Sequence, residues 1–164
     1  MARTMRRFKQ QLPAEDTERI LHNGKYCVLA VSGDDGYPYA VPVNYVYDGT
    51  AIYIHSAAQG HKIDALKRNL KCSMCIVDKD EVMPEQFTSY FRSVIVFGEA
   101  QFIESTDEKI AILRLLCEKY SPGIDPQAEI DRFINTVCII KISIESVSGK
   151  EAIELTRARH NTSQ

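Results

Sequence analysis

The 164-residue sequence predicts a mainly β protein, a closed or partly closed antiparallel barrel with a few peripheral helices. Two observations carry this prediction. Six segments have the short apolar or alternating pattern of strands, whereas helical spacing is confined to a few short stretches between them. The regular alternation of strands and helices that a doubly wound parallel sheet requires is absent from the sequence, and the helices are too few to cover both faces of such a sheet.

The first half of the chain begins with a helix and continues with three strands. Residues 12–22 favour a helix, because Pro13 suits a first turn and acidic residues follow it. The turn residues glycine and aspartate separate the strands. Pro42 cannot donate a hydrogen bond to a ladder and therefore marks an edge or a bulge. The three predicted strands are residues 26–31, 39–47 and 51–55.

In the second half the spacing of apolar residues alternates between helical and strand-like. Apolar residues three and four positions apart predict a short helix at 63–70. Ser105 and Glu108 form a capping box that opens a helix through about Tyr120, and a further short helix is expected near 129–135. The predicted strands are residues 72–77, 90–103 and 137–144.

We expect one folded domain with a short extension at each end. Residues 1–11 are interpreted as a flexible N-terminal arm, residues 12–153 as the domain and residues 154–164 as a polar C-terminal tail. Within the domain, the acidic segment 78–89 contains a proline and is interpreted as a loop.

Composition narrows the class of function. The 20 basic and 22 acidic residues give a formal charge of −2, which disfavours a duplex-DNA binder. No apolar run approaches the roughly 20 residues that cross a bilayer, and no apolar segment of a signal peptide follows the basic N-terminus. We therefore expect a cytoplasmic protein that binds neither nucleic acid nor membrane.

The cysteines predict no metal site. Cys72 and Cys75 have the spacing of a redox or zinc motif, but they lie in a predicted strand and no second such pair completes a zinc site. We interpret them as reduced core residues.

The segment from residue 53 to residue 62 carries the strongest indication of a ligand. A strand ends at His55 and Ser56, and Gly60, His61 and Lys62 follow at the start of a helix. Free N–H groups at a helix start, together with hydroxyl, imidazole and ammonium donors, suit a phosphate group. The alternative is a solvated turn with a structural histidine.

Arg92 and Ser93 form a polar pair at the head of an apolar strand. Such a pair fits a ligand site, and it fits equally a structural role toward a neighbouring loop. The residues alone leave both interpretations open.

Together these segments resemble the FMN-binding split-barrel flavoproteins of the pyridoxamine-5′-phosphate-oxidase-like superfamily, and in particular its 5-nitroimidazole-resistance (Nim-type) subgroup. The resemblance implies a six-stranded antiparallel Greek-key split barrel with peripheral helices. It also implies a homodimer with two FMN sites at the subunit interface. The matching segments are residues 36–45, 52–57, 60–62, 90–100 and 148–151.

The resemblance also implies roles for individual residues. The strand that matches residues 41–45 runs beside the isoalloxazine ring, and the segment that matches residues 55–62 holds the phosphate and ribityl chain. Ser93 matches a polar position that contacts the flavin, with Arg92 beside it. His55 is implicated in the chemistry, since an imidazole can hydrogen-bond the cofactor or pass a proton near neutral pH. The residues assigned to the cofactor are Val41, Pro42, Val43, Asn44, Tyr45, His55, Ser56, Gly60, His61, Lys62, Arg92 and Ser93.

The expected function is that of an FMN-binding oxidoreductase acting on a small molecule, with nitroimidazole-like compounds as the substrate class that the Nim-type resemblance implies. Pyridoxal-phosphate synthesis is disfavoured, because residues 40–47 contain no basic residue and the C-terminal Arg-x-His motif is not evident. The alternative is a module of the same fold that binds or stores a flavin or haem without turnover. The sequence contains no GxGxxG fingerprint, so a nicotinamide would act only as a transient reductant.

Overall fold

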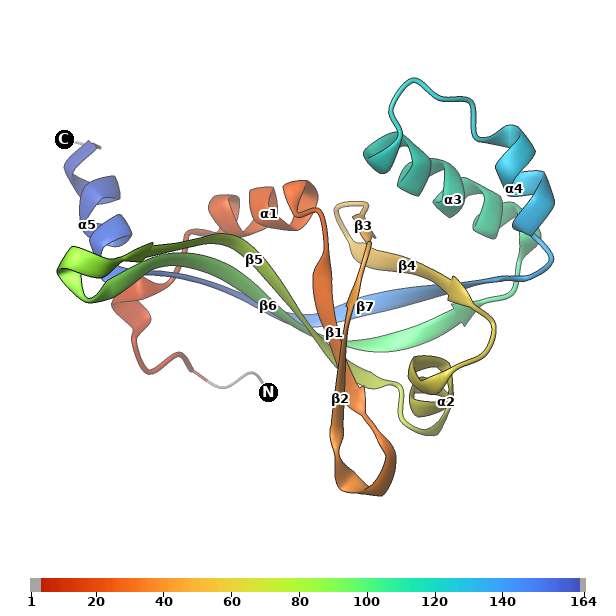
Figure 1. Cartoon of the computed structure of the whole chain (residues 1–164), viewed down its shortest axis with the longest axis horizontal. Helices are drawn as coiled ribbons and strands as arrows, with labels where there is room; N and C mark the ends of the chain where they lie inside the picture. The colour runs from red at the N-terminus through yellow and green to blue at the C-terminus, as the bar shows by residue number, and fades with distance from the viewer. Residues whose placement is uncertain (1–3, 163–164) are drawn as a thin grey trace.

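The computed structural model describes residues 4–162, which form one seven-stranded sheet in the order β2-β1-β5-β6-β7-β4-β3 (Figure 1). All neighbouring strands pair antiparallel, which confirms the predicted mainly β, antiparallel fold class. The strands are β1 (Cys27–Ser32), β2 (Pro38–Val43), β3 (Val46–Tyr47), β4 (Ala51–Ala57), β5 (Lys71–Met83), β6 (Thr88–Ile103) and β7 (Val137–Glu151). The helices are α1 (Ala14–Asn23), α2 (His61–Arg68), α3 (Thr106–Tyr120), α4 (Gln127–Phe133) and α5 (Ile153–Thr162).

The strand count is seven rather than the predicted six, because the strand expected at 39–47 is interrupted. Between β2 and β3, the Tyr45 N–H donates to the Tyr120 hydroxyl at 2.9 Å, and the oxygen of that hydroxyl lies 2.7 Å from the Tyr45 carbonyl. A side chain from α3 thus occupies the backbone groups that a continuous ladder would use. The contact joins residues 75 positions apart, so local sequence does not reveal it.

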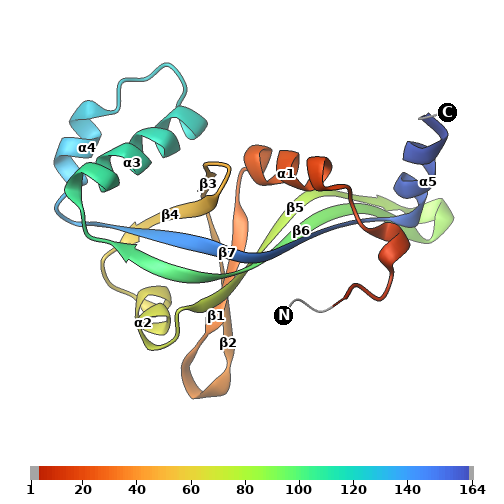
Figure 2. The same cartoon turned by 180° about the vertical axis from the view of Figure 1, so that it is seen from behind.

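The sheet wraps around one main core and carries a second, smaller core on its other face. Ile52 and Ile54 of β4 point into the main core with residues of α1 and α2. Tyr53, between them in sequence, points the opposite way and packs with Ile112 and Leu116 of α3. The helices α3 and α4 therefore cover one part of the outer face of the sheet. They lie at the end of the molecule opposite α5 and the tip of the β5–β6 hairpin (Figures 1 and 2).

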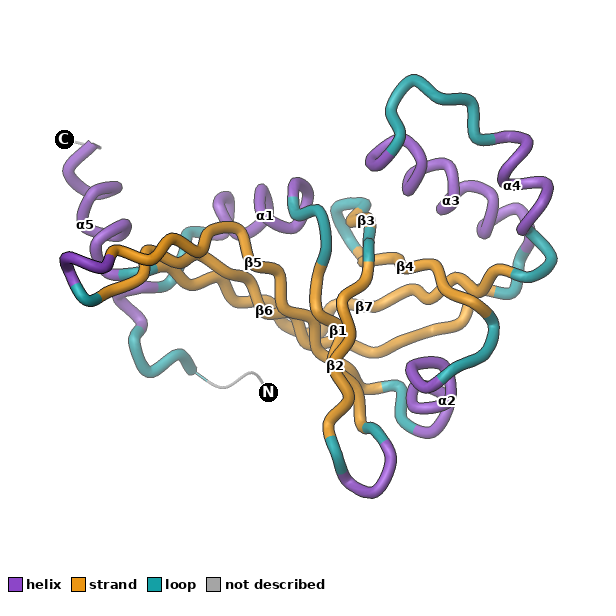
Figure 3. The backbone as a smooth tube through the Cα atoms, viewed as in Figure 1, coloured by secondary structure: helices purple, strands orange, loops and turns teal. Residues whose placement is uncertain are grey.

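The loop predicted at 78–89 is wrong. β5 continues to Met83, β6 begins at Thr88, and the two strands pair up to their ends across a short turn at Pro84–Gln86 (Figure 3). The reason is that this hairpin projects beyond the core, so most of its side chains are exposed and its sequence lacks the apolar alternation of a half-buried strand. Backbone pairing, rather than burial, holds the hairpin together.

The C-terminal segment, expected as a polar tail, contains α5. The helix is tied to the sheet by Glu151, whose side chain is fully buried at the end of β7. Arg159 of α5 donates to Glu151 Oε1 at 2.9 and 3.1 Å, and Arg92 of β6 donates to Oε2 at 3.3 and 3.4 Å. The boundaries set for the arm and tail stay predictions, and residues 1–3 and 163–164 lie outside the described residues.

Within residues 4–162, no helix combines the length and the apolar character that crossing a bilayer requires. The cytoplasmic location inferred from the sequence stays a prediction.

Candidate functional site

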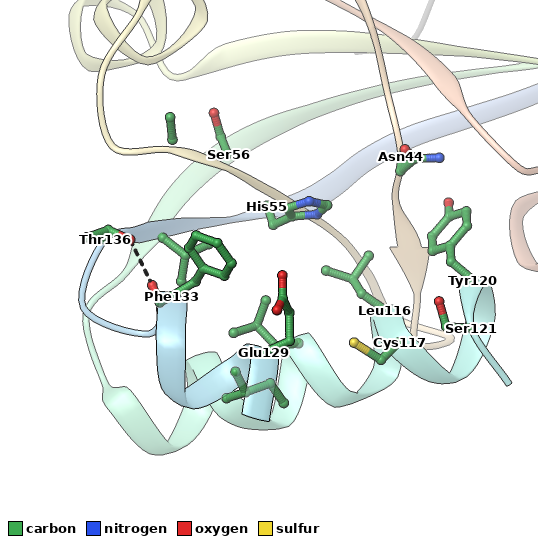
Figure 4. A pocket seen from close by; sticks show the side chains of 14 residues that line it. Asn44, His55, Ser56, Leu116, Cys117, Tyr120, Ser121, Glu129, Phe133 and Thr136 are labelled. Carbon is green, nitrogen blue, oxygen red and sulfur yellow. Dashed lines mark hydrogen bonds between the residues drawn. The ribbon is translucent and has the colours of Figure 1, made fainter. Parts of the chain in front are cut away.

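A pocket of about 660 Å³ lies between the end of β4 and the helices α3 and α4 (Figure 4). Three residues predicted from the sequence as cofactor ligands, Asn44, His55 and Ser56, line it together. The other lining residues come from β4, α3, α4 and the segments that flank the two helices, and they are Ala57, Leu113, Leu116, Cys117, Tyr120, Ser121, Glu129, Ile130, Phe133, Thr136 and Val137.

His55 presents its imidazole to the pocket because of its position on β4. It follows Tyr53 on the outer face of the sheet, whereas Ile54 points into the main core. Burial against the pocket wall and the nearby charge of Lys62 both hold the pKa of His55 below its ordinary value. This shift favours the neutral imidazole, in which one ring nitrogen donates a hydrogen bond and the other accepts one.

Ser56 and the start of α2 supply hydrogen-bond donors next to His55. Among the described residues, the Ser56 hydroxyl is buried without a hydrogen-bond partner, a situation that usually marks a missing ligand or water. Gly60 precedes α2 with a φ of 123°, which a residue with a side chain rarely adopts. The N–H of Ile63 donates to the Gly60 carbonyl at 2.9 Å, whereas the N–H groups of His61 and Lys62 precede the first bonds of the helix. Lys62, half-buried in this turn, adds an ammonium group. This set of donors suits an anion.

His61 is placed at the same helix start, but its side chain turns toward the β1–β2 hairpin. Its ring stacks on Tyr39 with the centroids 4.0 Å apart, and its Nε2 lies 3.5 Å from Asp34 Oδ2. These contacts hold the hairpin against α2, so the side chain of His61 has a structural partner already.

The strand predicted to lie beside a flavin ring is β2, an edge strand of the sheet. Val41 and Val43 pack against the main core, and Pro42 is exposed on the outer face, which agrees with the edge position predicted for it. Tyr45 is fully buried, with its hydroxyl 2.8 Å from the Leu21 carbonyl and its backbone hydrogen-bonded to Tyr120.

Arg92 and Ser93 lie far from the pocket within one chain. In the strand register, His55 is level with Ile139 and, one strand further, with Ile103. Arg92 precedes Ile103 on β6 by eleven residues (103 − 92), which corresponds to roughly 36 Å along an extended strand at about 3.3 Å per residue.

The two residues also differ in their surroundings. Arg92 forms salt bridges with Glu151 and, at 3.3 Å, with Asp78. These contacts give Arg92 the structural role that the sequence left open as an alternative. Ser93 pairs with Val77 and points to the outer face of the sheet, on the side of Pro42. Within one chain, therefore, Arg92 and Ser93 do not join the residues at the pocket.

The helical wall of the pocket was not predicted as part of a site. The helix that ends near Tyr120 is predicted from the sequence, but none of its residues is assigned to a site, and Glu129, Phe133 and Thr136 carry no signal in the sequence. The one available hint was a second short helix directly after α3, because two helices joined by a short turn form a wall that covers part of a sheet.

The geometry defines an antiparallel barrel-like protein with a ligand pocket on its outer face. The sequence profile of the pyridoxamine 5′-phosphate oxidase family matches residues 13–151, and the chain belongs to that family. The resemblance drawn from the sequence motifs is thereby confirmed.

Similar proteins are found by sequence and by structure. The uncharacterized protein RA0666 of Rhizobium meliloti is 30% identical over 125 residues, which span 71% of this chain and 76% of that protein. The crystal structure of a candidate 5-nitroimidazole antibiotic resistance protein from Bacteroides thetaiotaomicron is similar with a TM-score of 0.75 and 24% identity, over 86% of each chain. An FAD and heme binding protein from Mycobacterium smegmatis is similar with a TM-score of 0.74 and 21% identity, over 87% of this chain and 73% of that one.

Proposed function

We propose that this protein binds FMN and acts as an oxidoreductase on a small molecule, with nitro-aromatic compounds as the first substrate class to test. The observation that carries the proposal is the pocket lined by Asn44, His55 and Ser56, with the cationic start of α2 on the opposite side of β4. Membership of the pyridoxamine 5′-phosphate oxidase family supports it, as does the name of the structurally similar resistance protein.

The residues present fit the phosphate of FMN. The Ser56 hydroxyl is buried and lacks a partner among the described residues, so a phosphate oxygen would satisfy it. The backbone N–H groups of His61 and Lys62 at the helix start, and the Lys62 ammonium, supply the positive potential that a phosphate needs.

The residues also fit a flat ring beside the phosphate. Asn44, whose Nδ2 donates to the Lys25 carbonyl at 3.0 Å, offers its amide oxygen to such a ring on the β4 side of the pocket, where His55 also lies. A bound flavin would supply two-electron transfer to the site. The neutral His55 imidazole would hydrogen-bond the ring or its substrate and hold a proton there, while α3 and α4 would exclude water from that side.

We further propose that the functional unit is a homodimer. Directly paired residues point the same way, so the outer face of β2, β1, β5 and β6 carries a group of small and apolar side chains, bordered by the ion pair of Lys71 and Glu99. No helix of residues 4–162 packs on this face in the main or the smaller core. The face is formed by Val28, Ala30, Ala40, Pro42, Ser73, Cys75, Ile95 and Phe97.

A second copy of the chain is the occupant that we propose for this face. Ser93 and Pro42, both predicted to contact the cofactor, lie on it, and Ser93 is remote from the pocket within one chain. A two-fold pair would cover the apolar face and offer the Ser93 of one copy to the site of the other.

The dimer is tested by size exclusion. Phe97, 53% exposed on the β6 side of the face, is changed to Asp, and Phe87, 98% exposed at the hairpin tip, is changed to Asp as the matched control. We expect the wild type and F87D to elute at twice the chain mass, and F97D to elute as a monomer with weaker FMN binding. A monomeric wild type that binds FMN would contradict the shared site.

Cofactor binding is tested by titrating FMN into the apoprotein and following quenching of flavin fluorescence. Lys62→Ala removes the half-buried ammonium at the helix start, and Lys67→Ala removes an exposed lysine from the last turn of the same helix. We expect K62A to weaken binding by about 1.5–3 kcal/mol, the value of a charge-assisted hydrogen bond, and K67A to change it little. Equal affinities for K62A and K67A would remove Lys62 from the site.

Turnover separates the two functional alternatives. An enzyme would reduce a nitro-aromatic compound at the expense of a nicotinamide reductant, whereas a non-catalytic module would bind flavin or haem and show no reduction. Haem is tested beside FMN as a ligand, because histidine is a common haem ligand and His55 lines the pocket. In the enzyme, His55→Gln should reduce turnover while flavin stays bound.

A further inference from the structure

The pocket has two apolar walls that suit an aromatic ring. Leu113 and Leu116 of α3 form one wall, and Ile130 and Phe133 of α4 form the other. The volume of about 660 Å³ is in the range of small-molecule sites, which typically combine an apolar lining with a few convergent polar groups.

One carboxylate faces this apolar space. Glu129, in the first turn of α4, points into the pocket from the side opposite β4, toward the region where His55 lies (Figure 4). Among the described residues, Glu129 has no salt-bridge partner, and no other lining residue is an acid, a lysine or an arginine.

The cations on or against α4 have other partners. Arg132, one turn further along α4, lies over the ring of Phe133 with its guanidinium carbon 4.9 Å from the centroid, and Arg114 of α3 donates to Gln127 Oε1. Lys62 lies beyond His55 at the start of α2, on the other side of β4. A ligand that enters the apolar space therefore meets an unpaired negative charge at one end.

We propose that this pocket binds a small aromatic cation, with the ring between the walls of α3 and α4 and the cationic group at Glu129. Glu129 is then the residue that selects the charge of the substrate. The inference rests on the proposed function in that it assigns the substrate side of the same site. It concerns binding alone, so it can be tested without turnover.

Three ligands with the same ring separate charge from shape. Benzamidine carries a positive charge, benzamide is neutral, and benzoate is negative. Their dissociation constants are measured by isothermal titration calorimetry on the full chain, with and without added FMN. The variants are Glu129→Gln and, as the matched control, Glu118→Gln, which removes an exposed carboxylate of α3 that does not line the pocket.

We expect the wild type and E118Q to bind benzamidine about tenfold more tightly than benzamide, with benzoate weakest. In E129Q the preference for benzamidine over benzamide should fall to within about twofold. Thermal unfolding of the variants verifies that they are folded. Equal binding of benzamidine and benzamide by the wild type, or an unchanged preference in E129Q, would overturn the proposal.

The outcome is distinguishable from failure of the proposed function. Charge selection that depends on Glu129 in a protein that takes up no FMN would support the pocket assignment and reject the flavoprotein. FMN uptake without any charge selection would support the flavoprotein and reject the assignment of Glu129 to the pocket.

Discussion

Lys119, in the last turn of α3, carries a buried amine whose cost can be worked out from the structure. Among the described residues, its Nζ has no hydrogen-bond partner, and it lies 4.0 Å from the centroid of the Tyr45 ring and 5.6 Å from that of Tyr120. Burial lowers the pKa of Lys119 to about 8. We predict that Lys119→Met, which keeps the apolar stem and removes the amine, stabilises the protein at neutral pH.

The magnitude follows from the pKa difference. One pKa unit corresponds to about 1.4 kcal/mol, so a fall from the ordinary value of 10.5 to about 8 sets an upper limit near 3.5 kcal/mol for holding Lys119 protonated, and solvent screening of this half-buried residue lowers that cost. The attraction of the ammonium to the tyrosine rings offsets about 1–2 kcal/mol of this cost. We therefore expect K119M to raise the free energy of unfolding by about 1–2 kcal/mol at pH 7.

The pH dependence has a definite sign. Between pH 8 and 10.5 the unfolded chain keeps the proton on Lys119 and the folded chain releases it, so the wild type gains stability relative to K119M as the pH rises. Burial raises the pKa of Cys27, the thiol that interacts with Lys119, to about 12, so in the folded wild type this thiol keeps its proton through pH 9.5.

The assay is urea unfolding followed by far-UV circular dichroism at pH 7 and 9.5, since the chain has no tryptophan. Lys67→Met, at an exposed position of α2, is the control and should leave the stability unchanged. An advantage of K119M that is the same at both pH values, or absent at pH 7, would refute the reasoning.

Three further predictions concern the frame around the site, each checked by urea midpoints. Glu151→Gln removes the fully buried carboxylate that holds two arginines, and we expect a loss of about 2–4 kcal/mol; a loss below 0.5 kcal/mol would contradict a structural role. Tyr120→Phe leaves the N–H of Tyr45 without its acceptor and should cost about 1–3 kcal/mol, and wild-type stability would show that water replaces the hydroxyl. Gly149→Ala places a methyl group 2.9 Å from Leu12 Cβ and against Thr17, so we expect a loss of about 1–3 kcal/mol, and an unchanged midpoint would mean that α1 shifts freely.

The strands of the core were predictable because a buried strand requires apolar residues in a continuous or alternating run. Continuous or alternating apolar runs identified β1, β4 and the central part of β6, and the capping box of α3 is present, with the Glu108 N–H donating to Ser105 Oγ at 3.4 Å. The projecting β5–β6 hairpin was missed because it is exposed, so its residues lack an apolar period even though its backbone is fully paired.

Contacts between distant segments account for the other differences. The gap between β2 and β3 depends on the Tyr120 hydroxyl, and the anchoring of α5 depends on an ion pair between Arg159 and Glu151. Neither leaves a local pattern in the sequence. The same holds for the site. The sequence of residues 55–62 predicts phosphate binding, but the wall that includes Glu129 exists only because α4 folds back over β4.

The central claim is that the pocket between β4 and the helices α3 and α4 holds FMN. Its most direct test is the visible absorption spectrum of the purified protein, followed by mass identification of the chromophore released on denaturation. The account predicts a yellow protein that releases FMN, with one flavin per chain. A colourless protein that takes up no FMN at micromolar concentration would contradict it.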